Sequence, residues 1–179
     1  VFQRRPNWCA PLHNGTIPKD EMEEIRSSYK NIFQRCWDTV GGFLHTMDSR
    51  GTFEVSEKER EAFWEHLYQS RGFGIWQGNF KDMLIDPEAN KLMSEFVANK
   101  IRSRVSNPKT AEKLIPKDHG FGTRRVPLET HYFESYNRDN VELIDLTETP
   151  ILSITEDGLK TTDREFEFDI IIYATGFNA

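Results

Sequence analysis

The chain has 179 residues, a formal net charge of −6, 37% hydrophobic residues and 12% aromatic residues. The aromatic content favours a folded chain over a disordered one, and the negative charge gives no support for nucleic-acid binding. Neither a signal peptide nor an apolar run of the roughly 18 to 20 residues that span a bilayer is found, and two cysteines form no disulfide framework, so we expect a cytoplasmic protein without a membrane segment.

The first predicted elements are the end of a strand and a helix. Residues 1–4 have the pattern of a strand end and lead into a loop that contains three prolines. Apolar residues at helical spacing then gather on one face, and Gly41 and Gly42 are expected to end that helix. We expect Cys36 on this face to be a small core residue. The residues of the face are Met22, Ile25, Tyr29, Ile32, Phe33, Cys36 and Trp37.

The second helix is predicted from its N-terminal cap. Ser56 and Glu59 have the spacing of a capping box, and the helix is expected to end near Gly72. Residues 71–84 are rich in glycine and aromatic side chains, which predicts either a short irregular helix or a loop. The expected inward face of the second helix consists of Ala62, Phe63, His66 and Leu67.

The third helix has the clearest signals. Asp86 is a favourable N-cap, Pro87 suits the first turn, and the sequence Asn107-Pro108 is expected to end the helix. A short helix around residues 110–114 is predicted to stop at Pro116. The apolar stripe of the third helix consists of Ala89, Leu92, Met93, Phe96, Val97, Ile101 and Val105.

Beyond residue 116 the pattern changes towards strands. Residues 119–125 predict a loop bracketed by glycines, residues 128–137 a short helix and residues 140–145 a strand. The sequence Glu156-Asp157-Gly158 predicts a tight turn between two further strands.

The last predicted strand covers residues 167–173. Its three consecutive β-branched residues, 170–172, favour a strand that is covered on both faces. Thr175 and Gly176 follow it, and a glycine there allows backbone to pass close to other atoms.

Two pairs of adjacent arginines are the candidate binding residues. Arg4 and Arg5 follow a strand end, where ligands bind in α/β sheets, and guanidinium groups match the geometry of phosphate. Arg124 and Arg125 lie on a glycine-flanked loop that Pro127 stiffens, so that one can face a phosphate and the other a pocket. A solvated basic surface is the alternative for both pairs, and composition alone favours it for the first pair. No histidine or cysteine spacing predicts a metal site, and no glycine-rich phosphate motif is present.

Three stretches carry a resemblance to a known family. They are FQRRPNW at 2–8, KLIPKDHGFGTRRVPLETHYFESYNRDNVELIDL at 113–146 and EFDIIIYATGFNA at 167–179. Taken in this order, they resemble the middle of a Baeyer–Villiger monooxygenase, a flavin-dependent enzyme related to the flavin-containing monooxygenases. The resemblance is weaker through the helical block between the first two stretches.

The resemblance implies an α/β fold, in which the chain is a fragment of a flavoprotein with two dinucleotide-binding domains. This fragment is expected to consist mainly of a helical insertion followed by a small β-rich segment. Residues 1–8 would end the first half of an NADPH-binding domain, and residues 9–116 would form the helical insertion. Residues 117–165 would return to the NADPH domain, and residues 166–179 would lead back towards the FAD domain.

The resemblance also implies roles for the four arginines. Arg125 matches the family arginine that lies over flavin and nicotinamide and stabilises the negative flavin peroxide and the tetrahedral adduct. Arg4 matches the arginine that pairs with the 2′-phosphate of NADPH. Arg5 stands where threonine is usual, so it adds a second charge to that contact or points to solvent. Arg124 stands where lysine is common, also near the phosphate.

Two glycine positions are placed by the same resemblance. Thr175 and Gly176 match a turn that passes close to the flavin-binding region. Gly120 stands where proline is frequent, which implies that the loop before the second arginine pair is less rigid.

The implied reaction uses FAD and NADPH to convert a ketone into an ester or lactone with O2. The expected partners are therefore a small-molecule ketone and O2, together with the missing FAD-domain and NADPH-domain segments, and neither nucleic acid nor a membrane. Because both glycine-rich fingerprints and the family motif F-x-G-x-x-x-H-x-x-x-W-P are absent from the chain, we expect the isolated chain to be inactive. One alternative is a flavin-containing monooxygenase that oxidises nitrogen or sulfur. Another is a non-enzymatic helical interaction module whose partner surface is the aromatic stretch 73–80.

Overall fold

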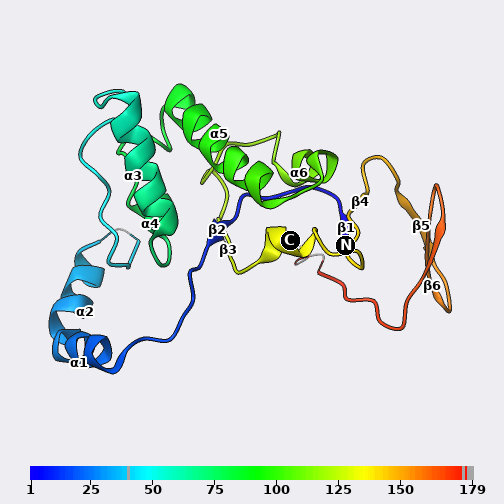
Figure 1. Ribbon diagram of the computed structural model, residues 1–179, viewed down its shortest axis with the longest axis horizontal. Coiled ribbons are helices and arrows are strands. Elements are labelled where there is room, and N and C mark those ends of the chain that lie inside the picture. Colours follow the sequence, from blue (N-terminus) through cyan, green and yellow to red (C-terminus); the bar gives the residue numbers. More distant parts are fainter. Residues whose placement is uncertain (40, 175, 177–179) are drawn as a thin grey trace.

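The computed structural model describes residues 1–39, 41–174 and 176. The molecule is elongated, with α1 and α2 at one end, α3 to α6 in the middle and the hairpin of β5 and β6 at the other end (Figure 1). The helices are α1 (Lys19–Ser27), α2 (Tyr29–Asp38), α3 (Glu57–Gln69), α4 (Gly74–Gln77), α5 (Pro87–Arg104), α6 (Pro108–Leu114) and α7 (Tyr132–Ser135). The strands are β1 (Phe2–Gln3), β2 (Ala10–Pro11), β3 (Leu128–Glu129), β4 (Ile144–Asp145), β5 (Ile151–Ile154), β6 (Gly158–Thr161) and β7 (Glu165–Glu167).

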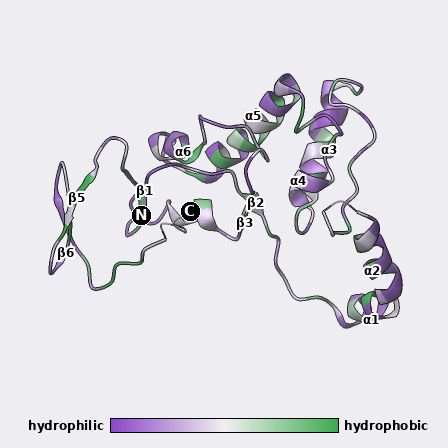
Figure 2. Cartoon of the chain, turned by 180° about the vertical axis from the view of Figure 1, so that it is seen from behind, coloured by the Kyte–Doolittle hydropathy of each residue, from purple (hydrophilic) through white to green (hydrophobic). Residues whose placement is uncertain are grey.

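The first predicted helix is two helices, α1 and α2, which meet at Ser28. Neither contains a buried residue, and Phe33 and Trp37 are 66% and 87% exposed. Cys36 is only half-buried, so the expectation that it belongs to the core is wrong. The reason is that no element of the described chain covers this face. Seen from behind, α1 and α2 lie well apart from α5 and α6 (Figure 2).

The cap of α3 is confirmed, but its inward face is different from the predicted one. The side chain of Ser56 accepts a hydrogen bond from the backbone N–H of Glu59, and the Glu59 carboxylate accepts one from the backbone N–H of Ser56. Leu67 is buried as expected and Phe63 is half-buried, whereas Ala62 and His66 are exposed. Two aromatic side chains, Trp64 and Tyr68, are buried in their place, because they pack against Phe80 and Phe96 at ring-centroid distances of 6.2 and 6.1 Å.

The third predicted helix is α5, and its cap is confirmed by hydrogen bonds from the Glu88 and Ala89 amides to Asp86. It ends at Arg104, before the predicted Asn107-Pro108, and Asn107 instead caps α6. Most of the predicted stripe is buried, but Leu92 is 36% exposed and Phe96 is only partly buried. The buried members of the stripe are Ala89, Met93, Val97, Ile101 and Val105.

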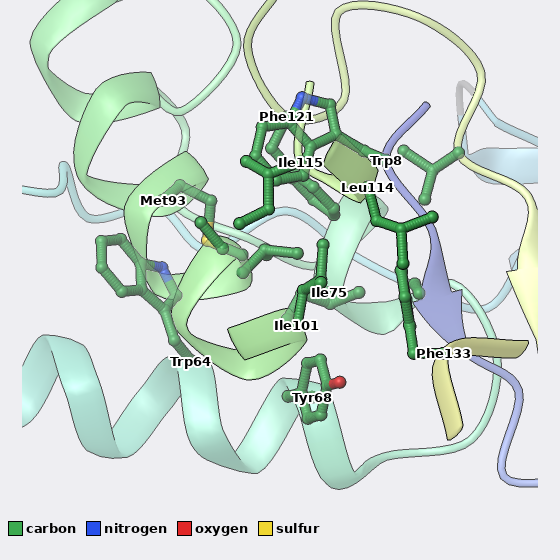
Figure 3. Packing of buried hydrophobic residues seen from close by; sticks show 14 of the residues in the cluster. Trp8, Trp64, Tyr68, Ile75, Met93, Ile101, Leu114, Ile115, Phe121 and Phe133 are labelled. Carbon is green, nitrogen blue, oxygen red and sulfur yellow. The ribbon is translucent and has the colours of Figure 1, made fainter. Parts of the chain in front are cut away.

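The stretch 73–80 is part of the core. It contains α4, and Ile75 and Phe80 are 1% and 2% exposed. The interpretation of this stretch as an exposed aromatic partner surface is therefore wrong. Ile75 and Phe80 belong to the cluster of buried apolar residues that also contains side chains of α3 and α5 (Figure 3).

Two short parallel strand pairs bring together segments that lie before and after the helices. β1 pairs with β4, and β2 pairs with β3, with Ala10 opposite Leu128. Parallel strands need a long crossover connection, and the helical block provides it here. The predicted strand at 140–145 is reduced to the two residues of β4, and the predicted short helix at 128–137 is the four-residue α7.

The predicted tight turn is confirmed, because β5 and β6 form an antiparallel pair on either side of it and β7 extends this pair to three strands. The long final strand is not confirmed. β7 ends at Glu167, and Ile170 and Ile172 are 77% and 86% exposed. The Phe168 N–H still donates to the Asp157 carbonyl at 2.8 Å, but no strand is formed by residues 168–173 in the described chain, and an isolated strand leaves its backbone hydrogen bonds unmade.

Helix length and hydropathy also bear on membrane insertion. Among the described residues, no helix combines the length and the apolar character that crossing a membrane requires.

Candidate functional site

The loop that carries Arg124 and Arg125 is held by two helices. Phe121 and Val126 are both 0% exposed and anchor the loop at two points. The backbone N–H of Phe121 donates to Ser94 Oγ at 2.9 Å, and its carbonyl accepts from Asn90 Nδ2 at 2.8 Å. From α4, Trp76 Nε1–H donates to the Gly122 carbonyl at 3.1 Å. The two arginines thus start from a fixed backbone.

Glycines are required on this loop for two different reasons. A Cβ atom on Gly120 would lie 1.7 Å from Asn90 Oδ1, so only glycine lets the loop approach α5 so closely. Gly122 has φ of +78°, and a Cβ atom there would lie 2.8 Å from Trp76. The expectation that Gly120 loosens this loop is therefore wrong, because close packing replaces the rigidity that proline would provide.

The first arginine segment lies beside this loop. Trp8 is 2% exposed, packs its ring edgewise on Phe121 and donates from Nε1 to the His119 carbonyl at 2.9 Å (Figure 3). Asn7 Nδ2 donates to the Arg125 carbonyl at 3.0 Å, and Asn7 Oδ1 lies 3.0 Å from His119 Nε2. The residues after Arg5 and the residues around Arg125 therefore share one hydrogen-bond network.

Asp118 joins one arginine from each predicted pair. Its Oδ2 atom lies 3.1 Å from Arg124 and 3.9 Å from Arg5. The hydrogen bond from His119 and the nearby charge of Arg124 lower the pKa of Asp118, so this carboxylate is ionised at neutral pH. Two guanidinium groups against one carboxylate leave a net positive charge at a partly exposed position, which suits an anion.

Arg4 and Arg5 line a cavity of about 610 Å³ between β1, α6 and α7. Ala174 also lines this cavity, so the segment before Gly176 reaches the same place. Cys9 is a further lining residue, and burial raises the pKa of its thiol to about 11, which favours the protonated thiol at neutral pH.

The remaining predicted site residues are less closely connected. The guanidinium groups of Arg4 and Arg125 are exposed and form no hydrogen bond or ion pair with any described residue. Gly176 is exposed with φ of +83°, and no atom lies within 4 Å of the position of its absent Cβ. Thr175 lies outside the described residues. Within residues 1–39, 41–174 and 176, no group of three or more His, Cys, Asp or Glu side chains is arranged to hold a metal ion.

Asn7, Asp118 and His119 are functional residues that the sequence pattern does not predict. Asn7 lies two positions after Arg5, and Asp118 and His119 lie six and five positions before Arg124, and this nearness is the one signal for them in the sequence. Their contacts depend on the packing of segments that are about 110 positions apart, as in the Asn7–His119 pair, which is separated by 112 positions.

A second charged cluster supports the strand that follows the arginine loop. Arg104, at the end of α5, donates to both oxygens of Glu129 at 2.7 and 3.1 Å and to both oxygens of Glu134 at 2.5 and 2.8 Å. It also donates to the Tyr68 hydroxyl at 3.0 Å. The hydrogen bond from Arg104 lowers the pKa of Glu134. This cluster joins β3 and α7 to α3 and α5, and so supports the loop from its C-terminal side.

No family model matches the chain, but several curated enzymes are similar to it over its whole length. The 2-oxo-Delta(3)-4,5,5-trimethylcyclopentenylacetyl-CoA monooxygenase of Pseudomonas putida is 51% identical over 179 residues, which cover 100% of this chain and 33% of the relative. Cyclopentanone 1,2-monooxygenase of a Comamonas strain is 39% identical over 181 residues and is also covered to 33%. Phenazine N-monooxygenase of Lysobacter antibioticus is 36% identical over 185 residues.

A crystal structure of OTEMO in complex with FAD and NADP is similar with a TM-score of 0.97 and 51% identity, over 100% of this chain and 33% of that one. The chain spans about a third of the length of the curated relatives it matches.

Proposed function

Because this chain is homologous along its whole length to Baeyer–Villiger monooxygenases, we propose that it forms about a third of an FAD- and NADPH-dependent enzyme that converts a ketone into an ester or lactone with O2. In this enzyme NADPH would supply the reducing equivalents, and FAD would activate O2. The chain would need the remaining parts of both nucleotide-binding domains to act. We place the enzyme in the cytoplasm, as the sequence predicts.

The observation that carries the proposal is the convergence of Arg5 and Arg124 on Asp118 beside the cavity that Arg4 lines. Guanidinium groups bind phosphate through charge and paired hydrogen bonds. The contact from Arg5 to Asp118, at 3.9 Å, is long enough to exchange for a phosphate oxygen. We therefore assign Arg4, Arg5 and Arg124 to the 2′-phosphate of NADPH.

Arg125 is the proposed catalytic residue. Its backbone is held by Asn7 and by the fully buried Val126, while its side chain is exposed and makes no contact that would hold it elsewhere in the described chain. A fixed backbone with an available, permanently charged guanidinium suits the stabilisation of negative charge that develops during a reaction.

The parallel pairs β1–β4 and β2–β3 support the proposed division of the chain. They connect residues 1–8 to residues 117–165 across the helical segment 9–116, as expected if the outer two ranges belong to one NADPH-binding domain. Residues 166–179, with Thr175 and Gly176, would then lead towards the FAD domain. The exposed Ile170 and Ile172 are consistent with a strand whose neighbours lie in that domain.

The test uses the complete protein that contains this chain. Arg125→Ala is expected to lower ester or lactone formation on the order of a hundredfold or more, as for other groups that stabilise developing charge. Arg138→Ala, on an exposed arginine without a side-chain partner in the described chain, is the matched control. Arg125→Ala with unchanged ketone oxidation would overturn the assignment.

A second reaction is favoured by one observation, the relative named a phenazine N-monooxygenase. The same purified protein, given either a ketone or a phenazine together with NADPH, separates the two reactions by product. The interaction-module alternative has lost its support, since residues 73–80 lie in the core.

A further inference from the structure

His119 has both ring nitrogens in contact with oxygen acceptors. Nδ1 lies 2.7 Å from Asp118 Oδ1, and Nε2 lies 3.0 Å from Asn7 Oδ1. The side chain is 6% exposed, so water does not replace these contacts. The His119 hydrogen bond holds the pKa of Asp118 low, and an ionised carboxylate can accept hydrogen bonds but cannot donate them.

The orientation of the Asn7 amide is determined by its other contact. Asn7 Nδ2 lies 3.0 Å from the Arg125 carbonyl oxygen and donates to it. If the Asn7 amide were turned over, its Oδ1 atom would face the Arg125 carbonyl oxygen, and both of these atoms are acceptors. Asn7 Oδ1 therefore faces His119 as an acceptor, and both ring nitrogens of His119 must donate. A histidine that donates from both nitrogens is an imidazolium.

The charged groups around His119 come from three parts of the chain. On its own loop, Asp118 contacts the ring directly and Arg124 contacts Asp118 in turn. From the first segment, Arg5 approaches the same carboxylate. His119 also lines a cavity of about 360 Å³ together with the charged residues Lys91, Glu95 and Arg102 of α5 and Lys117, which follows α6. Among these groups, Asp118 is the one in hydrogen-bond contact with the ring.

We propose that His119, as an imidazolium, is a positioning residue that couples the two arginine segments. Through Asp118 it holds the carboxylate on which Arg5 and Arg124 converge, and through Asn7 it holds the backbone of Arg125. Loss of the proton leaves one ring nitrogen facing an acceptor, so one of the two contacts is broken. This inference rests on the proposed function only for its consequence, which is that NADPH binding weakens when His119 loses a ring proton.

The charge on His119 is measured first, independently of any activity. The complete protein is labelled with ¹⁵N-histidine, and its imidazole nitrogens are followed by NMR from pH 6 to pH 9, with the His119→Asn spectrum identifying the His119 signals. Both nitrogens are expected to carry protons at pH 6, as their two acceptor contacts require. A single protonated nitrogen at pH 6 would overturn the proposal.

Two variants then separate the two contacts. In His119→Asn the side-chain nitrogen of the new asparagine lies about where Nδ1 of the histidine was, so it can donate to Asp118. In His119→Gln the side-chain nitrogen of the new glutamine lies about where Nε2 was, so it can donate to Asn7. Neither asparagine nor glutamine has a proton to lose in this way. In the unmodified protein we expect the dissociation constant for NADPH to rise on the order of tenfold when the second ring proton is lost, as for loss of one charge-assisted hydrogen bond.

In both variants the dissociation constant for NADPH should depend on pH only through the 2′-phosphate of the ligand, because the second pKa of such a phosphate is about 6. His119→Asn should bind NADPH more tightly than His119→Gln, since it retains the contact to Asp118. His66→Gln, at an exposed histidine of α3, is the control and should behave like the unmodified protein. Variants that keep the full pH dependence would contradict the proposal. A protein that binds no NADPH at any pH would instead overturn the proposed function and this consequence of it, while the NMR result still decides the charge on His119.

Discussion

At the scale of single residues, the arginine loop depends on the close fit between Gly120 and Asn90. Asn90 is 8% exposed, and its Nδ2 donates to the carbonyls of Met83 and Phe121 at 3.0 and 2.8 Å. Its Oδ1 occupies the space where a Cβ atom on residue 120 would lie. One buried amide thus connects the turn before α5 to the loop and leaves room only for glycine.

Gly120→Ala is therefore expected to destabilise the chain. A methyl group 1.7 Å from Asn90 Oδ1 forces the loop or the amide to move, which breaks buried hydrogen bonds. The expected loss in free energy of unfolding is about 1–3 kcal/mol, as for overpacking in other cores. Urea denaturation followed by tryptophan fluorescence measures it. Gly15→Ala is the control, because nothing lies within 4 Å of a Cβ atom there. Similar transition midpoints for the two variants would contradict the expectation.

At the scale of elements, the ends of helices follow the sequence closely while their buried faces follow the packing. Asp86 and Asn107 each cap a helix that has proline in its first turn. The following helix, α6, is then tied to α5 and to the loop by Glu112, which accepts from Arg102 at 2.7 Å and from Lys117 at 2.6 Å. The carboxylate thus holds three consecutive parts of the chain together.

The Glu112 ion pairs predict an acid-sensitive contribution to stability. The hydrogen bonds from Arg102 and then Lys117 lower the pKa of Glu112 from 4.5 to about 2. Because the folded-state pKa is the lower one, ionised Glu112 stabilises the fold above pH 4.5, and this contribution is lost as pH falls from 4.5 towards 2. The side chain is 47% exposed, so screening by solvent keeps the effect small.

Thermal unfolding between pH 2 and pH 6 measures this contribution. Glu112→Gln should lower the unfolding temperature at pH 6 and change it less at pH 2. The unfolding temperature of this variant should therefore depend less on pH than that of the unmodified chain. Glu61→Gln replaces a carboxylate that forms no ion pair in the described chain, and its profile should keep the original shape. Parallel profiles for Glu112→Gln and the unmodified chain would show that the ion pairs contribute nothing.

At the scale of the whole molecule, apolar side chains are exposed in two separate regions. One is the face of α2 with Phe33 and Trp37, at the end of the molecule away from α5 and α6 (Figures 1 and 2). The other is the segment with Ile170, Ile172 and Tyr173, which are 77%, 86% and 67% exposed. Clusters of exposed apolar side chains mark surfaces that other protein parts cover.

The 179-residue chain on its own is therefore expected to self-associate. Sedimentation velocity over a range of concentrations measures the association. The double change Phe33→Ser and Trp37→Ser should weaken it, since it removes most of the exposed apolar surface of α2. Ile85→Ser is the control, because Ile85 is 81% exposed but lies outside both regions. A chain that sediments as a monomer at all concentrations would show that these surfaces do not drive association.

The candidate site could be predicted from the sequence only in part. The four arginines were found because each pair is adjacent in the chain and follows a turn or strand end. The residues that connect them are Asn7, Asp118 and His119, and their nearness to the arginines is the one signal for them in the sequence. The Asn7–His119 contact cannot be predicted locally, since it reaches across 112 positions. A contact of this kind exists only after the helical block has folded and brought the two segments together.

The sequence by itself determined the features that depend on near neighbours. These are the caps at Ser56 and Asp86, the tight turn before β6 and the resemblance to one enzyme family. The tertiary structure alone decided that the apolar face of α1 and α2 is left uncovered, that Trp64 and Tyr68 of α3 are buried, and that residues 168–173 form no strand within the described chain. The physical reason is one of range: a cap or turn completes its hydrogen bonds within a few residues, whereas a strand or a buried face requires partners that are distant in sequence.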